Sequence, residues 1–268
     1  TFLMIRPPPR STLNATRRQR QMCIRDSRGI DLDIYPGQII GYIGPNGAGK
    51  TTTVKILIGM LPDFEGEVTV FGVDLAENPL EVKQRIGYVP ETAALYDTLT
   101  PTEYLRFIGL IYGIPQKETE ARSLKMLKLF GLESEANVRM NAFSKGMKQK
   151  TLIIAGMIHD PDILFLDEPL AGLDANTAIV IKEMLAQLAA EGKTIFYCSH
   201  VMDVVERICN RIIIIDDGTI IANGTFDELQ SMNKGKSLER IFSRLTGSSG
   251  HAEKAQDIIS AFHREQTE

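Results

Sequence analysis

A glycine-rich segment at residues 44–51 constrains the fold of this chain more than any other feature. It follows a segment that is predicted to be a strand, Gln38–Ile43, and it precedes a predicted helix, Lys50–Met60. The glycines let the backbone curl so that successive N–H groups point inward, and the following helix directs its positive end to the same point. A loop of this kind between a strand and a helix predicts an anion-binding site on an α/β fold.

The segment also matches the pattern G-x-x-x-x-G-K-[ST] of phosphate-binding loops. In that pattern Lys50 reaches the β- and γ-phosphates of a nucleotide, and the Thr51 hydroxyl is a ligand of Mg²⁺. The residues expected to contact the nucleotide here are Gly44, Pro45, Asn46, Gly47, Ala48, Gly49, Lys50, Thr51 and Thr52. A glycine-rich surface loop is the alternative, but it would not need a strand before it and a helix after it.

Two adjacent acids, Asp167 and Glu168, follow the apolar run Ile163–Leu166. Such a run is typical of a strand buried on both faces, and ligands of α/β proteins bind at the carboxyl ends of such strands. Two acids alone would usually be a solvated strand end. With a phosphate loop upstream, we expect Asp167 to hold Mg²⁺ and Glu168 to orient or deprotonate an attacking water.

The remaining pattern predicts an α/β fold of the P-loop NTPase type, with a mainly parallel sheet, antiparallel β elements and a helical insertion. The insertion covers about residues 95–160, where Thr100 to Glu103 form a capping box around a proline at the first helical position. Strands and helices alternate after it. We expect a core domain at residues 29–225 and a helical extension at residues 226–268.

Residues 1–28 differ from the rest of the chain. Seven of them are arginine and one, Asp26, is acidic, and they show neither strand alternation nor a helical stripe. Met22–Ser27 matches a translation of the mosaic-end DNA used in transposase-based sequencing libraries, although an arginine-rich start is also typical of transit peptides. We expect this segment to be disordered or foreign to the natural protein.

Composition excludes some classes of protein. The whole chain has a formal net charge of −4, so the part beyond residue 28 is acidic, which argues against nonspecific nucleic-acid binding. The three cysteines have no metal-ligand spacing, and their small number suits a reducing compartment. No apolar run reaches the roughly 20 residues of a membrane span, so a role at a membrane would require a partner that supplies the spans.

Three further segments resemble the motifs of ATP-binding-cassette (ABC) ATPases and appear in the family's order. Phe143–Lys150 resembles the signature loop, Ala171–Asp174 resembles the D-loop, and Cys198–His200 resembles the strand end that carries the switch histidine. The resemblance runs from about Gly29 to Thr225. It implies the ATP-hydrolysing subunit of an exporter-type ABC transporter, with ATP and Mg²⁺ as its ligands.

The resemblance also implies a pair of subunits, a homodimer or two related ATPases, that clasp two ATP molecules head to tail. In such a pair Ser144 and Gly146 touch the γ-phosphate held by Lys50 of the other subunit, and Asp174 acts across the interface. His200 contacts the γ-phosphate. The helical insertion faces a transmembrane permease, which places the protein at the cytoplasmic face of the cell membrane. No nucleic-acid partner is implied.

The chain departs from the family pattern in three places. Glu91 stands where the family has a glutamine that is a ligand of Mg²⁺; a glutamate can still serve as a ligand and assist catalysis, but it adds negative charge beside the phosphates. Lys145 and Met147 replace the usual glycine and glutamine of the signature loop. The first strand and the aromatic residue that stacks on adenine belong upstream of Gly29, where the sequence shows no sign of them.

Two other functions remain open at this point. One is a soluble ABC-class ATPase acting in translation or DNA repair, although this chain has neither a second cassette nor a long coiled coil. The other is a regulatory module that binds nucleotide but hydrolyses it weakly, which Glu91 and the missing adenine-stacking residue would favour. A GTPase is disfavoured because Asn233–Lys236 lacks the acidic residue that reads guanine.

Overall fold

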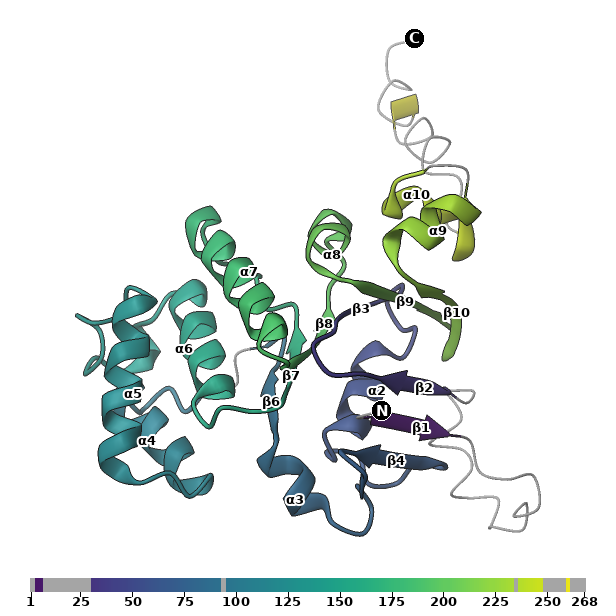
Figure 1. Ribbon diagram of the computed structural model, residues 1–268. Helices are drawn as coiled ribbons and strands as arrows, with labels where there is room; N and C mark the ends of the chain where they lie inside the picture. The colour runs from purple at the N-terminus through teal and green to yellow at the C-terminus, as the bar shows by residue number, and fades with distance from the viewer. Residues whose placement is uncertain (1–2, 7–29, 93–94, 234–235, 248–258, 261–268) are drawn as a thin grey trace.

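In the computed structural model of the chain, a six-stranded sheet lies at the centre of the described residues, 3–6, 30–92, 95–233, 236–247 and 259–260 (Figure 1). Its strand order is β10-β9-β3-β8-β7-β6, with every neighbouring pair parallel except β9 and β10. The strands are β3 (Ile39–Ile43), β6 (Ile86–Val89), β7 (Ile163–Asp167), β8 (Thr194–Cys198), β9 (Arg211–Asp216) and β10 (Thr219–Gly224). The predicted fold class, a mainly parallel sheet with antiparallel elements, is confirmed.

The burial of the strands explains their sequences. Every residue of β3, β7 and β8 is buried, because these strands lie inside the sheet and carry packed side chains on both faces. The edge strand β10 has no buried residue and is polar at several positions. Continuous apolar runs in the sequence therefore correspond to the inner strands of the sheet.

A second, antiparallel sheet has the order β2-β1-β4-β5. Its strands are β1 (Leu3–Arg6), β2 (Leu32–Ile34), β4 (Glu67–Val70) and β5 (Val73–Asp74). The helix α2 (Lys50–Leu57) contributes Val54 and Leu57 to a core shared with strands of both sheets. This core fixes the helix that begins at Lys50 against the central sheet.

The strand β1 corrects the expectation of disorder for Leu3–Arg6, which lies within the segment 1–28. Leu3–Arg6 pairs antiparallel with β2 on one side and with β4 on the other, so the first strand missing from the sequence analysis is present. Four residues followed by Pro7–Pro9 are too short a run to display alternation, and the pairing is set by strands that lie far along the chain. Residues 1–2 and 7–28 lie outside the described residues.

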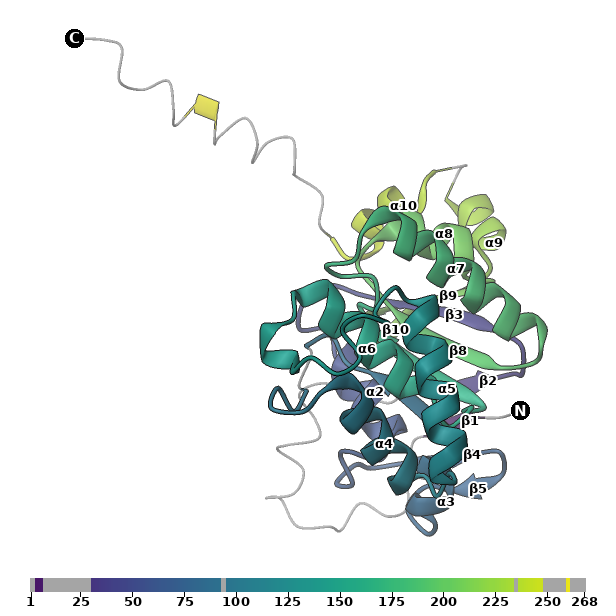
Figure 2. The same cartoon turned by 90° about the vertical axis from the view of Figure 1, so that its left-hand side faces the viewer.

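Three helices of the insertion form a separate subdomain at one end of the central sheet, facing the viewer in Figure 2. They are α4 (Pro101–Ile111), α5 (Gln116–Leu129) and α6 (Lys145–Met157), with a short 3₁₀ helix, η1 (Met140–Ala142), before α6. The capping box predicted for the first of them is present, since Thr100 Oγ1 accepts from the Glu103 N–H and Glu103 accepts from the Thr100 N–H. Leu105, Leu127 and Ile154 form the core of this subdomain.

The remaining helices are α3 (Pro79–Gln84), α7 (Ala175–Ala190), α8 (Met202–Ile208), α9 (Phe226–Met232) and α10 (Leu238–Leu245). Residues of α7, α8, α9 and α10 pack on the face of the central sheet opposite α2. Of the helical extension expected at residues 226–268, α9 and α10 lie within the described residues, whereas residues 234–235, 248–258 and 261–268 lie outside them. Within the described part of the chain, no helix has both the length and the apolar composition of a membrane span.

Candidate active site

The strand order brings four separated segments to one edge of the central sheet. The strands β3, β8, β7 and β6 are consecutive neighbours and run parallel, so their carboxyl ends lie side by side. The segments that follow them line one cavity of about 270 Å³. All of the lining residues are among those predicted from the sequence: Asn46, Gly47, Gly49, Lys50, Thr51, Thr52, Glu91, Asp167, Glu168 and His200.

The loop before α2 has the shape that its glycines predict. Gly49 precedes the helix with a φ of 98°, in the left-handed region that other residues rarely adopt. A Cβ atom on Gly44 would lie 2.4 Å from the carbonyl oxygen of Ile215, so only glycine lets the loop pack this closely on β9. The loop therefore presents the first turn of α2, with its free N–H groups, to the cavity.

The Lys50 ammonium lies against this loop. Its Nζ donates to the carbonyl oxygens of Gly44 at 2.7 Å and Pro45 at 3.0 Å, which holds the positive charge at the loop. A lysine here and the positive end of α2 favour the binding of an anion with several oxygens.

Three carboxylates face this positive group across the cavity. Burial raises the pKa of Asp167, and the nearby charges of Glu91 and Glu168 raise it further, whereas a hydrogen bond from Thr51 and the charge of Lys50 oppose the rise. Thr51 Oγ1 lies 3.4 Å from Asp167 Oδ2. Ionisation of Asp167 therefore costs more here than it does in water, and a divalent cation beside the carboxylate would lower that cost.

The donor set fits Mg²⁺ rather than a metal held by protein alone. Thr51, Asp167 and Glu91 supply hard oxygen donors, which Mg²⁺ prefers. Across the described residues, no three His, Cys, Asp or Glu side chains converge in a way that could hold a metal ion. Mg²⁺ commonly takes one or two carboxylates from the protein and completes its shell with phosphate oxygens and water. A site with only Asp167 and Glu91 as carboxylate donors, and with no cluster of three such side chains, therefore fits Mg²⁺.

Glu168 is held from two sides. Its Oε1 atom accepts from the His200 backbone N–H at 2.8 Å and lies 2.7 Å from His200 Nδ1, while Oε2 accepts from the Ser199 hydroxyl at 3.0 Å. The Glu168 side chain is 12% exposed, and its backbone φ of 48° lies in the left-handed region. A carboxylate fixed in this way at the cavity wall can orient a water molecule and accept its proton.

Ser199 is the contact of Glu168 that the sequence analysis missed. Ser199 precedes His200 in the segment that resembles the family's switch-histidine motif. Its position in the sequence does not indicate which strand lies next to β8. The pairing of β7 with β8, with Asp167 opposite Cys198, brings Ser199 next to Glu168. Only the order of strands in the sheet could have revealed this contact.

Six predicted residues do not line this cavity: Gly44, Pro45 and Ala48 of the loop, and Ser144, Gly146 and Asp174. Ser144 caps α6 by accepting from the Met147 N–H at 3.3 Å. A Cβ atom on Gly146 would lie 2.6 Å from the Gly172 carbonyl oxygen, so the signature and D-loop segments are in close contact. Asp174 caps α7, and hydrogen bonds from the Thr177 hydroxyl and N–H lower its pKa to about 2. One chain therefore does not gather all of the predicted site residues.

Comparison with known proteins gives consistent matches. A family model described as "ABC transporter" matches residues 27–171. The ABC transporter ATP-binding protein NatA of Bacillus subtilis is 39% identical over 83% of this chain and 91% of its own length. A solved structure of the ATP-binding subunit of an ABC transporter is similar with a TM-score of 0.80 and 30% identity, covering 92% of this chain and all of that one. A dimeric ATP-binding cassette bound to ADP and Pi, in a post-hydrolysis state, is similar with a TM-score of 0.69 and 27% identity, over 74% of this chain and 90% of that one.

Proposed function

Because this chain belongs to the ABC transporter family as an ATP-binding, ATP-hydrolysing subunit, we propose that it works as a pair around two MgATP and drives a separate transmembrane permease. The observation that carries the proposal is the single cavity shared by Lys50, Thr51, Asp167, Glu168 and His200. The match to a transporter subunit such as NatA favours this function over a soluble ATPase of translation or repair. The proposed location is the cytoplasmic face of the cell membrane, and the proposed direction is export.

The residues of the cavity have distinct roles in this proposal. Lys50 and the N–H groups of the loop bind the β- and γ-phosphates, and His200 contacts the γ-phosphate. Thr51, Asp167 and Glu91 would hold Mg²⁺, which when bound offsets the phosphate charge. Glu168 orients the attacking water and takes its proton. Ser144, Gly146 and Asp174 act on the nucleotide held by the other subunit, which accounts for their distance from this cavity.

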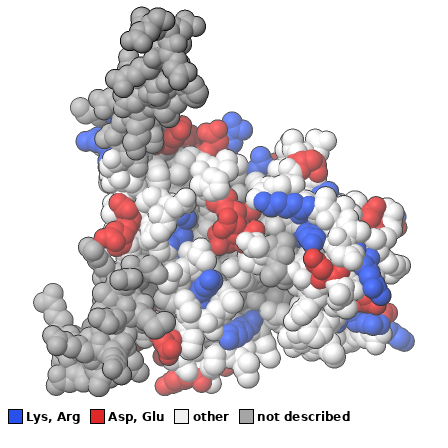
Figure 3. Space-filling view, turned by 180° about the vertical axis from the view of Figure 1, so that it is seen from behind, with Lys and Arg blue, Asp and Glu red and all other residues white. Residues whose placement is uncertain are grey.

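A nucleic-acid partner is not part of this proposal. Figure 3 shows the face opposite to that of Figure 1, where lysine and arginine side chains are interspersed with aspartate and glutamate over the described residues. A protein that binds nucleic acid usually gathers its positive charges into a patch or stripe.

The proposed role of Glu91 predicts strong dependence on the metal. Chelation of Mg²⁺ should stop ATP hydrolysis, and Glu91→Gln should strengthen the binding of metal-free ATP about tenfold, since a unit charge near phosphate is worth about 1–2 kcal/mol. Binding of a fluorescent ATP analogue, titrated with and without Mg²⁺, measures this. Glu183→Gln, on the exposed side of α7, is the matched control and should bind as the wild type does. Equal metal-free affinity of Glu91→Gln and wild type would remove Glu91 from the phosphate site.

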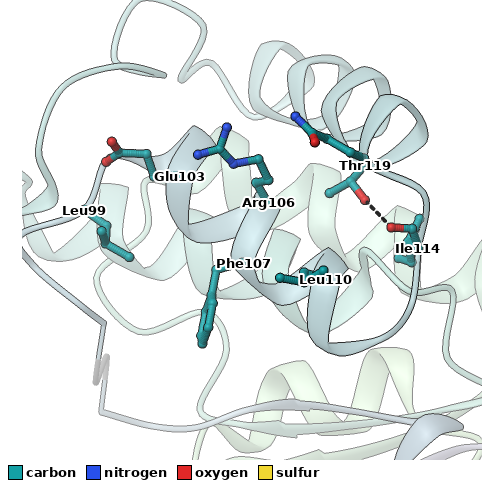
Figure 4. A pocket seen from close by; sticks show the side chains of 8 residues that line it. Leu99, Glu103, Arg106, Phe107, Leu110, Ile114 and Thr119 are labelled. Carbon is teal, nitrogen blue, oxygen red and sulfur yellow. Dashed lines mark hydrogen bonds between the residues drawn. The ribbon is translucent and has the colours of Figure 1, made fainter.

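The helical subdomain offers a surface for the proposed permease. A groove of about 450 Å³ runs along α4 (Figure 4). Its lining includes Phe107, which is 42% exposed, and Leu110, which is 75% exposed. Figure 4 shows the charged side chains of Glu103 and Arg106 on one side of α4 and Phe107 pointing to the other. An apolar groove with charges of both signs at its border fits a short amphipathic helix of a partner protein.

Leu110→Asp should weaken the complex with the permease without changing the ATP affinity of the isolated subunit, because a charge in the groove cannot be paired by an apolar helix face. A candidate permease is taken from the genes adjacent to that of this protein, co-expressed with it and purified in detergent. Leu129→Asp is the matched control, because Leu129 is 71% exposed and lies outside the groove. Equal recovery of the permease with both variants would contradict this placement of the partner.

A further inference from the structure

We propose that Ser199 is a positioning residue for ATP hydrolysis, which holds the Glu168 carboxylate in the orientation that activates water. The inference rests on the proposed role of Glu168 as the group that accepts the proton of the attacking water. Ser199 lies in the Cys198–His200 segment, where the family resemblance assigns a role to His200 alone.

The two oxygens of Glu168 have different partners. Oε1 is held by His200 through the backbone N–H and the ring Nδ1, whereas the Ser199 hydroxyl is the donor to Oε2, at 3.0 Å. With His200 alone, the carboxylate could turn about the axis through Oε1. The second hydrogen bond removes that freedom, and therefore fixes which lone pair of Glu168 faces the cavity.

Ser199 is itself rigidly placed. It is 2% exposed and directly follows β8, whose last residue, Cys198, pairs with Asp167 of β7. Its Oγ atom also accepts from the Val201 N–H at 3.1 Å. That bond occupies a lone pair of the hydroxyl, and the side chain of Tyr197 is a further hydrogen-bond partner of Ser199. The Glu168 N–H donates to the Cys198 carbonyl oxygen at 2.9 Å, so the backbones on both sides of the contact are joined.

A purely structural role for Ser199 would produce different effects. If its hydroxyl served only to accept from Val201 at the start of α8, its removal would lower the melting temperature and disturb nucleotide binding along with turnover. A positioning role acts through Glu168 alone. It lowers kcat, leaves KM for ATP and the melting temperature near their wild-type values, and depends on the carboxylate being present.

The first test compares three variants of the full chain by steady-state hydrolysis of MgATP and by thermal unfolding. Ser199→Ala should lower kcat about tenfold with unchanged KM, as expected for one hydrogen bond to a charged group. Ser199→Thr keeps the hydroxyl and should recover most of the rate. Ser123→Ala is the matched control: Ser123 is 1% exposed on α5, far along the chain from the site, and its Oγ has no hydrogen-bond partner among the described residues. It should hydrolyse ATP as the wild type does.

The second test is a double-mutant cycle with Glu168→Gln, read by single-turnover hydrolysis of radiolabelled ATP. If Ser199 acts through the carboxylate, Ser199→Ala should cause no further loss in the Glu168→Gln background. Equal losses in both backgrounds, or a fall in kcat that Ser199→Thr does not recover, would overturn the inference. If Glu168 does not have its proposed role, Glu168→Gln alone will hydrolyse ATP at the wild-type rate. That result distinguishes failure of the proposed function from failure of the inference about Ser199.

Discussion

Glu168→Gln should lower ATP turnover about 10²–10⁴-fold while leaving the affinity for MgATP near that of the wild type. The amide keeps the shape of the side chain but cannot accept a proton from the attacking water. The groups that hold the nucleotide, Lys50 and the surrounding loop, are unchanged. Phosphate release under saturating MgATP and equilibrium binding of a fluorescent ATP analogue together separate the two effects. Glu183→Gln, the same change at an exposed glutamate of α7, is the isosteric control and should hydrolyse ATP normally.

The same variant should reveal the pairing of subunits. If each ATP is gripped by Lys50 of one subunit and Ser144 of the other, ATP that is not hydrolysed should hold the pair together. Glu168→Gln should therefore elute as a dimer with MgATP and as a monomer without nucleotide on a sizing column. A variant that binds ATP and stays monomeric would speak against the shared site unless the permease is required to align the subunits, which the same measurement on the permease complex decides.

Ser144→Arg should abolish the MgATP-dependent dimer of Glu168→Gln while leaving nucleotide binding at Lys50 intact. Ser144 stands at the N-terminus of α6, where its hydroxyl caps the helix and where a free helix end can receive phosphate oxygens. The arginine side chain would fill the space that the second subunit's nucleotide needs. The expected result is a monomer that still binds the fluorescent ATP analogue.

This variant needs a control for loss of the helix cap, which costs about 1 kcal/mol. Thermal unfolding monitors that cost directly. Ser134→Arg, an exposed serine in the same subdomain, adds the same side chain away from the cap of α6 and should leave the dimer intact. If Ser144→Arg still forms the dimer with MgATP, the signature segment does not reach the nucleotide of the other subunit.

The local features of the site and of the helical subdomain could be predicted from the sequence, because each depends on only a few consecutive residues. The loop at Gly44–Thr51 requires glycines at left-handed or crowded positions, and the capping box at Thr100 requires a hydroxyl and a glutamate three residues apart. The position of Asp167 and Glu168 at the end of a buried strand could be predicted as well, because a continuous apolar run marks a strand covered on both faces.

What the sequence could not determine is which strands lie side by side, because strand pairing joins segments that are distant along the chain. The order β3-β8-β7-β6 alone brings Lys50, His200, Glu168 and Glu91 to one cavity. The pairing of Leu3–Arg6 with β2 and β4 was hidden for the same reason. The contact of Ser199 with Glu168 depends on the register between β7 and β8, which is set by packing across the whole sheet rather than by the residues that meet there.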